Sequence, residues 1–412
     1  MFVLYDLAVL LSWFFLHLLA LFSPKIRQFT TGRKKVFPYL EQHRDPAKPL
    51  IWMHAASLGE FEQGAPVLEK LVQQYPGHQF LITFFSPSGY EVKKDRLSPH
   101  LVTYLPMDTR RNAREFIRLA RPDIALFIKY EVWPRFYREL EREGVPILLF
   151  SARFRPGQAY FKWYGGLLRS ALRRVSRFYV QDAASARLLE DSGMGEVVVS
   201  GDTRFDRVLG ILEDSRDLPF MEAFTRNRTC LVAGSTWPED HRVLLPFIES
   251  APENTCVVIA PHKTDPRTVE TLVRELPRPS LRYSEITGAN MQEAEVLIVD
   301  TIGLLTRIYG YADLAYVGGG FATGLHNTLE PAVYGIPVLI GPDYEGFLEA
   351  EALVAGGGIL VVQDAEDFRA KAGELLGSKK RRAALGGRNA DYIRKNRGAT
   401  DTIVSGIREL LG

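Results

Sequence analysis

The sequence predicts an α/β protein of two domains, each a parallel sheet with helices on both faces. Its 412 residues are too many for one ordinary core and suit two domains. Short, continuously apolar runs alternate with amphipathic stretches in both halves, which is the pattern of strands buried on both faces and joined by helices. A charged, helix-like stretch without such a run, residues 206–228, divides the two series and predicts a linker.

The expected strands coincide with the apolar runs. In the first half they are residues 50–57, 79–86, 101–108, 123–131, 145–153, 177–182 and 197–202, and in the second half 230–236, 256–262, 294–301, 314–320, 337–342 and 358–364. Their alternation with helices indicates βαβ units wound into open parallel sheets. Two Rossmann-like domains joined by one linker describe the GT-B architecture, with an active site in the cleft that both domains face. Ligands are expected there beyond the carboxyl ends of the strands.

The first 24 residues predict a membrane anchor. The run from Phe2 to Phe22 is nearly continuously apolar and approaches the roughly 20 residues that span a bilayer. Asp6 and His17 interrupt it, so a helix that packs on the domain or lies in the membrane interface is the alternative. The lysines and arginines of residues 25–35 would keep the following chain in the cytoplasm and attract anionic head groups.

Composition excludes several functional classes. Hydrophobic residues make up 46% and charged residues 24% of the chain, which is typical of a globular protein. A net charge of +2 gives no argument for a nucleic-acid partner. Both cysteines lie in apolar runs, where buried thiols are expected. The sequence contains no D-x-D, H-E-x-x-H, G-x-S-x-G or P-loop motif, so we expect no metal and no cofactor.

The strand ends of the second half indicate a nucleotide pocket. The triplet Gly318-Gly319-Gly320 ends one strand and precedes a helix that we expect to open at Glu330 and Pro331. Glycines allow close approach of the backbone to a ligand, and a helix N-terminus offers N–H groups to an anion. The carboxylate of Glu330 is of the type that accepts hydrogen bonds from the two hydroxyls of a ribose. A glycine-rich turn with a capping glutamate is the alternative.

Three other strand ends carry similar chemistry. Ser235 and Thr236 are helix-capping types and also phosphate ligands, and a cap alone would explain them equally well. His262 and Lys263 follow the next strand, and Gly303 follows another. Each loop has a structural explanation by itself, but together they predict one nucleotide pocket.

The first half places charged residues at its own strand ends. Glu60 follows Gly59 where the first strand gives way to a helix, Glu131 ends the fourth strand, and Arg204 follows the seventh. The helix N-terminus would lower the pKa of Glu60, whereas partial burial would raise it. Each of these charges, taken singly, is more often structural than catalytic.

These stretches together resemble the 3-deoxy-D-manno-octulosonic acid (Kdo) transferases of Gram-negative bacteria. The resemblance covers nearly the whole chain, and its motifs occur in family order as HAASLGE, KYEVWP, SARFRPGQAYFKWYG, GDTRFD, AGST, DTIGLL and HNTLEP. It implies a GT-B enzyme that transfers Kdo from CMP-Kdo to the glucosamine disaccharide of a lipid A precursor. It also implies an inverting reaction without a metal, at the cytoplasmic face of the inner membrane.

The resemblance assigns roles to individual residues. Glu60 matches the catalytic base, and Glu131 and Arg204 match positions that stabilise the transition state. With the strand-end residues, the candidate CMP-Kdo site comprises Ser235, Thr236, Pro261, His262, Lys263, Ile302, Gly303, Leu304, Gly318, Gly319, Asn327, Thr328, Leu329 and Glu330. The chain departs from the family where relatives often have arginine for His262, lysine for Arg204 and Met-Gly-Glu for residues 302–304. Leu304 cannot accept a hydrogen bond through its side chain.

Under this interpretation the chain divides into five segments. They are an anchor (1–24), an acceptor-binding domain (25–205), the linker (206–228), a CMP-sugar-binding domain (229–385) and a C-terminal helix that packs back on the first domain (386–412). Two other functions stay open. One is a different GT-B enzyme, such as another nucleotide-sugar transferase or a sugar-nucleotide epimerase. The other is a membrane-tethered, non-catalytic binding protein that keeps the fold.

Overall fold

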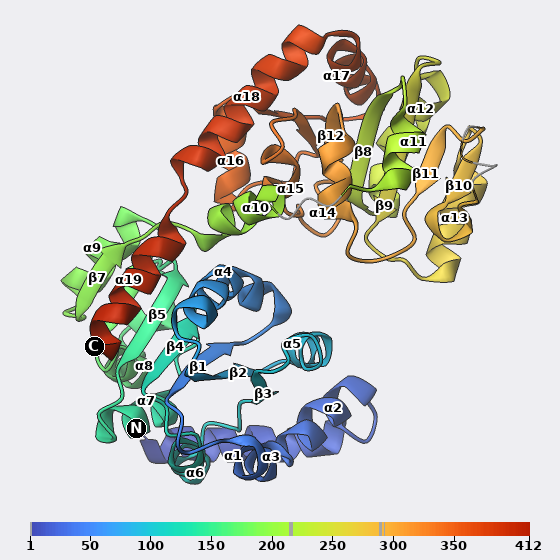
Figure 1. The fold of residues 1–412 in the computed structure, drawn as a ribbon. Coiled ribbons are helices and arrows are strands. Elements are labelled where there is room, and N and C mark those ends of the chain that lie inside the picture. The colour runs from blue at the N-terminus through green and yellow to red at the C-terminus, as the bar shows by residue number, and fades with distance from the viewer. Residues whose placement is uncertain (1, 214–216, 288–290, 292) are drawn as a thin grey trace. The chain divides into compact units, whose positions relative to one another are not determined.

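The computed structural model divides into two compact units. Unit 1 comprises residues 1–207 and 397–412, and unit 2 comprises residues 208–396. The structure describes residues 2–213, 217–287, 291 and 293–412, so residues 214–216 of the predicted linker lie outside the described part. Figure 1 labels the helices and strands.

Unit 1 is built on one parallel sheet of strand order β3-β2-β1-β4-β5-β6-β7. The strands are β1 (Leu50–Ala55), β2 (Gln79–Phe84), β3 (Leu101–Tyr104), β4 (Ile124–Ile128), β5 (Ile147–Ala152), β6 (Arg177–Val180) and β7 (Glu196–Val199). Strands β1 to β5 are almost entirely buried, which explains their continuously apolar sequences. Each lies within a run that the sequence predicts as a strand.

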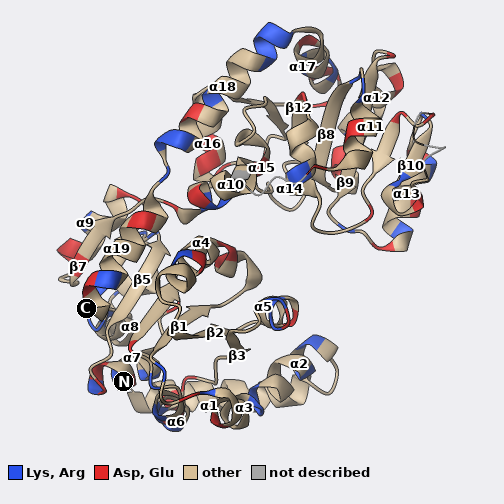
Figure 2. Cartoon of the chain, viewed as in Figure 1, with Lys and Arg blue, Asp and Glu red and all other residues tan. Residues whose placement is uncertain are grey.

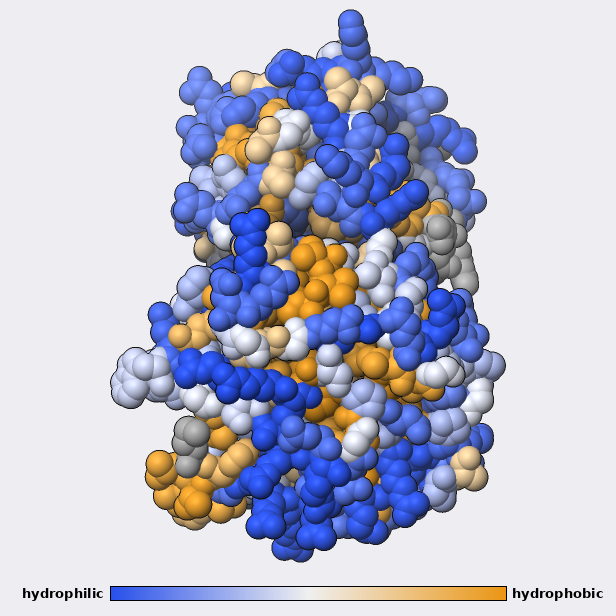
Figure 3. All heavy atoms as spheres, turned by 90° about the vertical axis from the view of Figure 1, so that its left-hand side faces the viewer, coloured by the Kyte–Doolittle hydropathy of each residue, from blue (hydrophilic) through white to orange (hydrophobic). Residues whose placement is uncertain are grey.

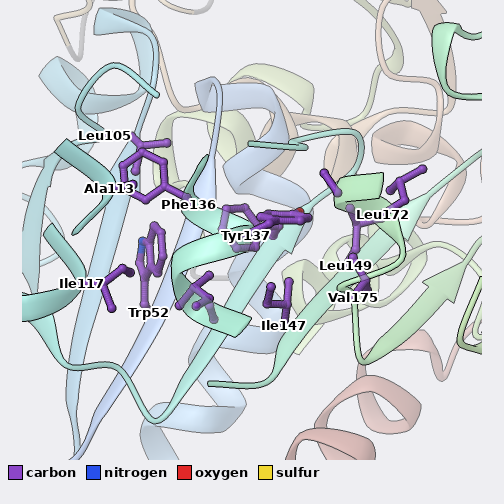
Figure 4. Packing of buried hydrophobic residues seen from close by; sticks show 14 of the residues in the cluster. Trp52, Leu105, Ala113, Ile117, Phe136, Tyr137, Ile147, Leu149, Leu172 and Val175 are labelled. Carbon is purple, nitrogen blue, oxygen red and sulfur yellow. The ribbon is translucent and has the colours of Figure 1, made fainter. Parts of the chain in front are cut away.

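Helices cover both faces of this sheet. They are α1 (Phe2–Leu19), α2 (Pro24–Arg33), α3 (Val36–His43), α4 (Leu58–Gln74), α5 (Pro87–Lys93), α6 (Arg110–Ala120), α7 (Pro134–Arg142), α8 (Gly166–Leu172), α9 (Ala183–Asp191), the start of α10 (Thr203–Glu213) and α19 (Ala399–Leu411), with a short 3₁₀ helix at Ala159–Phe161. One core lies between the sheet and α3, α6, α7 and α8, where Trp52, Phe136 and Tyr137 pack together (Figure 4). A second core lies under α4 and α19 on the other face.

Unit 2 contains a second parallel sheet, of order β10-β11-β9-β8-β12-β13-β14. Its strands are β8 (Thr229–Thr236), β9 (Thr255–Pro261), β10 (Ser280–Arg282), β11 (Val296–Ile298), β12 (Leu314–Val317), β13 (Val338–Ile340) and β14 (Ile359–Val361). The edge strand β10 is not among the strands that the sequence predicts. Cys230 and Cys256 face each other in β8 and β9, both buried, as expected.

The helices of unit 2 follow its strands. They are α11 (Pro219–Thr225), α12 (Pro238–Ser250), α13 (Pro266–Glu275), α14 (Leu305–Ile308), α15 (Leu329–Ala332), α16 (Leu348–Ala355), α17 (Ala365–Gly377) and α18 (Lys379–Lys395), with 3₁₀ turns at Tyr283–Glu285 and Tyr309–Tyr311. The core beneath α12, α13 and α17 contains Leu244, Phe247 and Phe368.

The C-terminal segment divides between the units. Helix α18 belongs to unit 2, whereas α19 belongs to unit 1, where Arg177 pairs with Glu409 at 2.7 Å and Ile403 lies in the core beside α4. The N-terminus of α19 is fixed by Asp206, whose carboxylate accepts hydrogen bonds from the N–H groups of Gly398 and Thr400. The α/β class and the two parallel sheets that the sequence predicts are therefore confirmed.

Candidate active site

The first group of site residues lies where the strand order of unit 1 reverses. Strands β1 and β4 are neighbours, but the chain continues from β1 toward β2 and from β4 toward β5, on opposite sides. Loops that leave such a pair diverge and open a crevice beyond the carboxyl ends of the strands. Glu60 follows β1 and Glu131 follows β4, so the fold brings both predicted carboxylates to this switch point.

Glu60 is turned back over the end of β1 by its local hydrogen bonds. Ser57 caps helix α4 by accepting from the N–H of Glu60. The Glu60 carboxylate in turn accepts a hydrogen bond of 2.7 Å from the N–H of Ala56. Burial raises the pKa of Glu60, and the negative charge of Glu131 raises it further against the opposing effects of Ala56, Lys129 and His54. A carboxylate with a raised pKa is a stronger base than an ordinary one.

Glu131 is held by two ring nitrogens. Its Oε2 lies 3.2 Å from His54 Nε2 and accepts a hydrogen bond of 3.1 Å from Trp133 Nε1. The backbone reaches this position through Lys129, whose φ of 60° lies in the left-handed region. Glu131 is therefore fixed in place, whereas the hydrogen bond that orients Glu60 comes from the backbone.

His54 belongs to the site, although the sequence does not single it out. It is fully buried in β1, and its Nδ1 lies 2.9 Å from the hydroxyl of Thr83. Trp52 Nε1 can only donate, and it donates to the same hydroxyl at 2.8 Å. Nδ1 of His54 also lies 3.1 Å from the Thr83 backbone oxygen, and Nε2 faces Glu131. The chain of hydrogen bonds runs from the core to a carboxylate of the site.

Arg204 is held beside helix α4 by its neighbours in the chain. Its Nε and Nη2 donate to Oδ2 of Asp202 at 2.9 and 2.7 Å. The hydroxyl of Thr203 donates to the backbone oxygen of Gln63 in α4 at 2.6 Å. Residues 201–206 are thereby attached to the helix whose first turn contains Glu60, and the guanidinium is oriented by a carboxylate before any substrate binds.

The second group of site residues lies at the strand reversal of unit 2. There β8 and β12 are neighbours, and the glycines follow β12. A Cβ on Gly318 would come within 2.5 Å of the backbone oxygen of Ser235, so the two strand ends approach more closely than other residues allow. Gly319 has a φ of 98° and contacts the backbone of Gly324. The sequence predicts these glycines for close approach of the backbone to a ligand, whereas in the structure they meet other loops of the unit.

Asp240 joins the two loops. It is fully buried in the first turn of α12, and its carboxylate accepts hydrogen bonds from the Tyr316 hydroxyl at 2.6 Å, the Trp237 N–H at 2.7 Å and the Gly319 N–H at 3.0 Å. Burial raises its pKa against these bonds. In the sequence, Asp240 looks like an ordinary acidic residue in the first turn of a helix. Nothing there marks it as the connection between β8 and the glycine loop.

Three aromatic rings stack above these strand ends. His262 lies face to face with Trp237, at 4.5 Å between ring centres, and with His326, at 4.6 Å. Trp237 Nε1 donates to His326 Nε2, and the ammonium of Lys263 lies 5.2 Å from the Trp237 ring centre. Partial burial lowers the pKa of His262 and that of His326. Both shifts favour the neutral form of the imidazoles, and the nearby ammonium of Lys263 carries a positive charge.

Ser235 and Thr236 differ in their orientation. Ser235 has a φ of 54°, in the left-handed region that a serine adopts mainly in tight turns. The Thr236 hydroxyl is buried and lies 3.1 Å from His241 Nε2, so it is occupied within the unit. Pro261 ends β9, and the N–H of His262 donates to the Thr236 oxygen, which brings the β8 and β9 loops together.

Two further predicted segments meet at Glu330. Its carboxylate accepts hydrogen bonds of 3.0 Å from the Thr306 hydroxyl and from the Asn327 side chain. Residues 302–304, with Gly303 at a φ of 98°, immediately precede α14 and are exposed or partly exposed. Thr328 and Leu329 are buried, and the Thr328 hydroxyl has no hydrogen-bond partner among the described residues.

A helix begins where the sequence predicts one, at Glu330 and Pro331. Helix α15 is a single turn of 4 residues that begins at Leu329, and Gly335 follows it with a φ of 69°. A single turn sums few peptide dipoles, so its N-terminus contributes little to the binding of an anion. The anion-binding role of this turn stays a prediction.

Comparison with known proteins shows which family the chain resembles. The model of the 3-deoxy-D-manno-octulosonic-acid transferase (kdotransferase) family matches residues 31–207, which contain Glu60, Glu131 and Arg204. A 3-deoxy-D-manno-octulosonic acid transferase of Haemophilus influenzae is 27% identical, over 96% of this chain and 95% of its own length. A Bordetella pertussis protein of the same name is 27% identical over 89% of each chain.

The chain is therefore similar to Kdo transferases, through the family model over residues 31–207 and through relatives at 27% identity over most of its length. Among solved structures, UDP-GlcNAc 2-epimerase of Neisseria meningitidis bound to UDP-GlcNAc has a TM-score of 0.63 at 16% identity, covering 87% of this chain and all of its own. That likeness concerns the fold alone and agrees with the GT-B-like architecture predicted from the sequence.

Proposed function

We propose that this protein transfers Kdo from CMP-Kdo to the glucosamine disaccharide of a lipid A precursor of the lipid IVA type, with inversion and without a metal. The match of residues 31–207 to the Kdo transferase family model, together with a raised-pKa carboxylate at the switch point of the matched unit, supports the proposal. We further propose that the reaction takes place at the cytoplasmic face of the inner membrane, to which α1 attaches the chain. Unit 1 then receives the acceptor and unit 2 holds CMP-Kdo.

In this mechanism Glu60 is the general base. It takes the proton of the acceptor's primary hydroxyl while that oxygen attacks the anomeric carbon of Kdo from the face opposite the leaving group. The bond between that carbon and the phosphate oxygen breaks, and CMP leaves as an anion. The configuration at the anomeric carbon is inverted because attack and departure occur on opposite faces.

The other residues stabilise charge in the transition state. The sugar gains oxocarbenium character, which the carboxylate of Glu131 stabilises, and Arg204 offers its guanidinium to a substrate carboxylate or phosphate. In unit 2 we assign the phosphate of CMP to Ser235 and Lys263. The rings of Trp237 and His262 offer a surface for the base, and Glu330 suits the ribose hydroxyls.

One assay distinguishes Kdo transfer from the two alternative functions, a non-catalytic binding protein and an epimerase. The protein is incubated with CMP-Kdo carrying radiolabelled Kdo, with and without a tetraacyl glucosamine disaccharide lipid, in the presence of EDTA. We expect label in the lipid and release of CMP only when the lipid is present, at a rate that EDTA leaves unchanged. Binding of CMP-Kdo without transfer would support a non-catalytic binding protein. Conversion of UDP-GlcNAc, supplied instead of CMP-Kdo, would support an epimerase.

The pH profile tests the pairing of Glu60 with Glu131. The rate of transfer falls as pH decreases through the pKa of the base, because only the carboxylate form accepts the proton. Since burial and Glu131 raise this pKa, we expect the acidic limb of kcat/KM above the pH at which an ordinary glutamate titrates. Glu131→Gln removes a like charge and should move the limb to lower pH, apart from any loss in kcat. An unmoved limb in a folded variant would contradict the coupling.

A further inference from the structure

Helix α1 has two faces of different chemistry. The face toward unit 1 carries Tyr5, Asp6, Trp13 and His17, all partly covered. The outward side chains are 44% to 80% exposed, and they are Val3, Leu4, Leu7, Leu10, Leu11, Phe14, Phe15, Leu18 and Leu19. Apart from Ser12, every polar or hydrogen-bonding side chain of the helix therefore faces the protein, and the outer face is apolar along its length.

The N-terminal half of α1 is fixed to unit 1 by charged and polar contacts. Asp6 forms an ion pair with the buried Arg135 of α7, with 2.8 Å between Oδ1 and Nε. The Tyr5 hydroxyl donates to Asp108 at 2.6 Å. The Phe2 ring lies 4.1 Å from the guanidinium carbon of Arg135. Asp108 also accepts from the N–H groups that begin α7, so α1 and α7 share one anchor.

The C-terminal half of α1 packs on α2 and the strand ends. The Trp13 ring lies 6.4 Å from that of Phe29, which lies 5.2 Å from that of Phe85. Phe85 in turn contacts Trp133, the residue that donates to Glu131. The whole helix, about 27 Å long at 1.5 Å per residue, therefore lies against unit 1 (Figure 1).

A helix that crosses the bilayer would have to leave these contacts. Asp6 would enter the hydrocarbon without Arg135, and Arg135, whose side chain is 8% exposed, would stay behind as a buried unpaired charge. The same movement would remove the Tyr5 donor from Asp108. The length and hydropathy of α1 fit a helix that spans the bilayer, but the position of its polar residues on one face does not.

Exposed basic residues lie at both ends of the helix. At its N-terminal end a cavity of about 610 Å³ is lined by Phe2 and Val3, by five arginines and by three carboxylates. The arginines are Arg110, Arg114, Arg135, Arg138 and Arg142, and the carboxylates belong to Asp6, Glu139 and Glu141. At its C-terminal end lie Lys25, Arg27, Lys34 and Lys35, all exposed. Figure 2 shows an almost uncharged α1 with arginine and lysine on the neighbouring helices, and Figure 3 shows apolar side chains gathered beside a broad hydrophilic surface.

We propose that α1 does not cross the membrane but lies in its plane, with the outer face in the interface of an anionic phospholipid bilayer. An apolar face flanked by basic residues fits lipid tails and anionic head groups at once. The arginine-lined cavity then receives a lipid phosphate. Through Trp13, Phe29, Phe85 and Trp133, the docked helix borders the residues around Glu131. The proposal concerns attachment and does not depend on the identity of the sugar donor.

The location of the N-terminus tests this orientation. The full chain is given an N-terminal epitope tag, expressed in a Gram-negative host, and collected in inverted and in right-side-out inner-membrane vesicles. We expect an added protease to remove the tag in inverted vesicles and to leave it intact in right-side-out vesicles, because the N-terminus stays on the cytoplasmic side. The opposite pattern would show a spanning helix and overturn the proposal, whatever the enzyme transfers.

The outer face is tested with vesicles and matched variants. Leu7→Glu with Leu11→Glu should lower binding of the purified protein to phosphatidylcholine–phosphatidylglycerol vesicles at least tenfold, because two apolar side chains leave the interface. Val199→Glu, at an equally exposed position on edge strand β7, is the control and should bind as before. Arg110→Glu with Arg114→Glu should weaken binding to these vesicles but not to phosphatidylcholine alone. Unchanged binding of the double leucine variant, with an unchanged melting temperature, would contradict the proposal.

Discussion

Glu60→Gln should lower kcat for Kdo transfer by about 10²–10⁴-fold, the usual contribution of a general base. Glutamine fills the same space and still accepts the hydrogen bond from the Ala56 N–H through its amide oxygen, so the turn after β1 should keep its shape. It cannot take the proton of the attacking hydroxyl at neutral pH. The affinity for CMP should stay within about twofold, because the nucleotide residues that we propose lie in unit 2.

The matched control for this variant is on the same helix. Glu69→Gln removes an exposed carboxylate of α4 that pairs with Arg207 at 3.5 Å, and it should leave kcat unchanged. Transfer is followed as label incorporated into the acceptor lipid, and CMP binding is measured by titration calorimetry. A Glu60→Gln enzyme with the turnover of the unmodified protein would remove Glu60 from the role of base.

Asp240→Ala should have the largest effect on unit 2. The change leaves the Tyr316 hydroxyl and the N–H groups of Trp237 and Gly319 without their common acceptor in a buried site. At about 1–3 kcal/mol for each buried donor left unsatisfied, the loss in the free energy of unfolding should be about 3 kcal/mol or more. The glycine loop and Trp237 should lose their fixed positions, and CMP binding should weaken with them.

Urea unfolding and CMP titration measure these two consequences separately. Glu239→Ala is the control, because it removes the adjacent carboxylate of α12, which makes none of the three hydrogen bonds. Asp240→Asn should be intermediate, since one amide oxygen remains but the amide nitrogen faces donors. If Asp240→Ala were as stable as Glu239→Ala and bound CMP equally well, the carboxylate would not organise the nucleotide loops.

Much of the fold could be predicted because buried parallel strands have an unmistakable sequence. Strand β4 is fully buried and reads as an unbroken apolar run, and the strands around it read alike. Strand β10 was missed because it has only three residues, Ser280–Arg282, and only its middle residue is buried. The start of helix α15 could be predicted because Pro331 and Glu330 are typical of a helix start, whereas its end after one turn, before Gly335, could not.

The candidate site could be predicted only where its residues lie at strand ends. Glu60 and Glu131 are charged residues directly after apolar runs, and the switch-point rule brings such residues together. His54 lies inside a strand, and a histidine within an apolar run is interpreted as a core residue. Its contact with Glu131 depends on the pairing of β1 with β4, which the sequence does not show. The hydrogen bond between Asp240 and Gly319 depends in the same way on the pairing of β8 with β12.

The most direct test of the central claim is mass spectrometry of the lipid product. The full-length protein is incubated in anionic vesicles with CMP-Kdo and a tetraacyl glucosamine disaccharide lipid, with the Glu60→Gln protein in parallel. We expect the acceptor to gain the mass of Kdo in a linkage of inverted anomeric configuration, with one CMP released for each sugar transferred. An acceptor of unchanged mass, from folded protein that binds CMP-Kdo, would contradict the account.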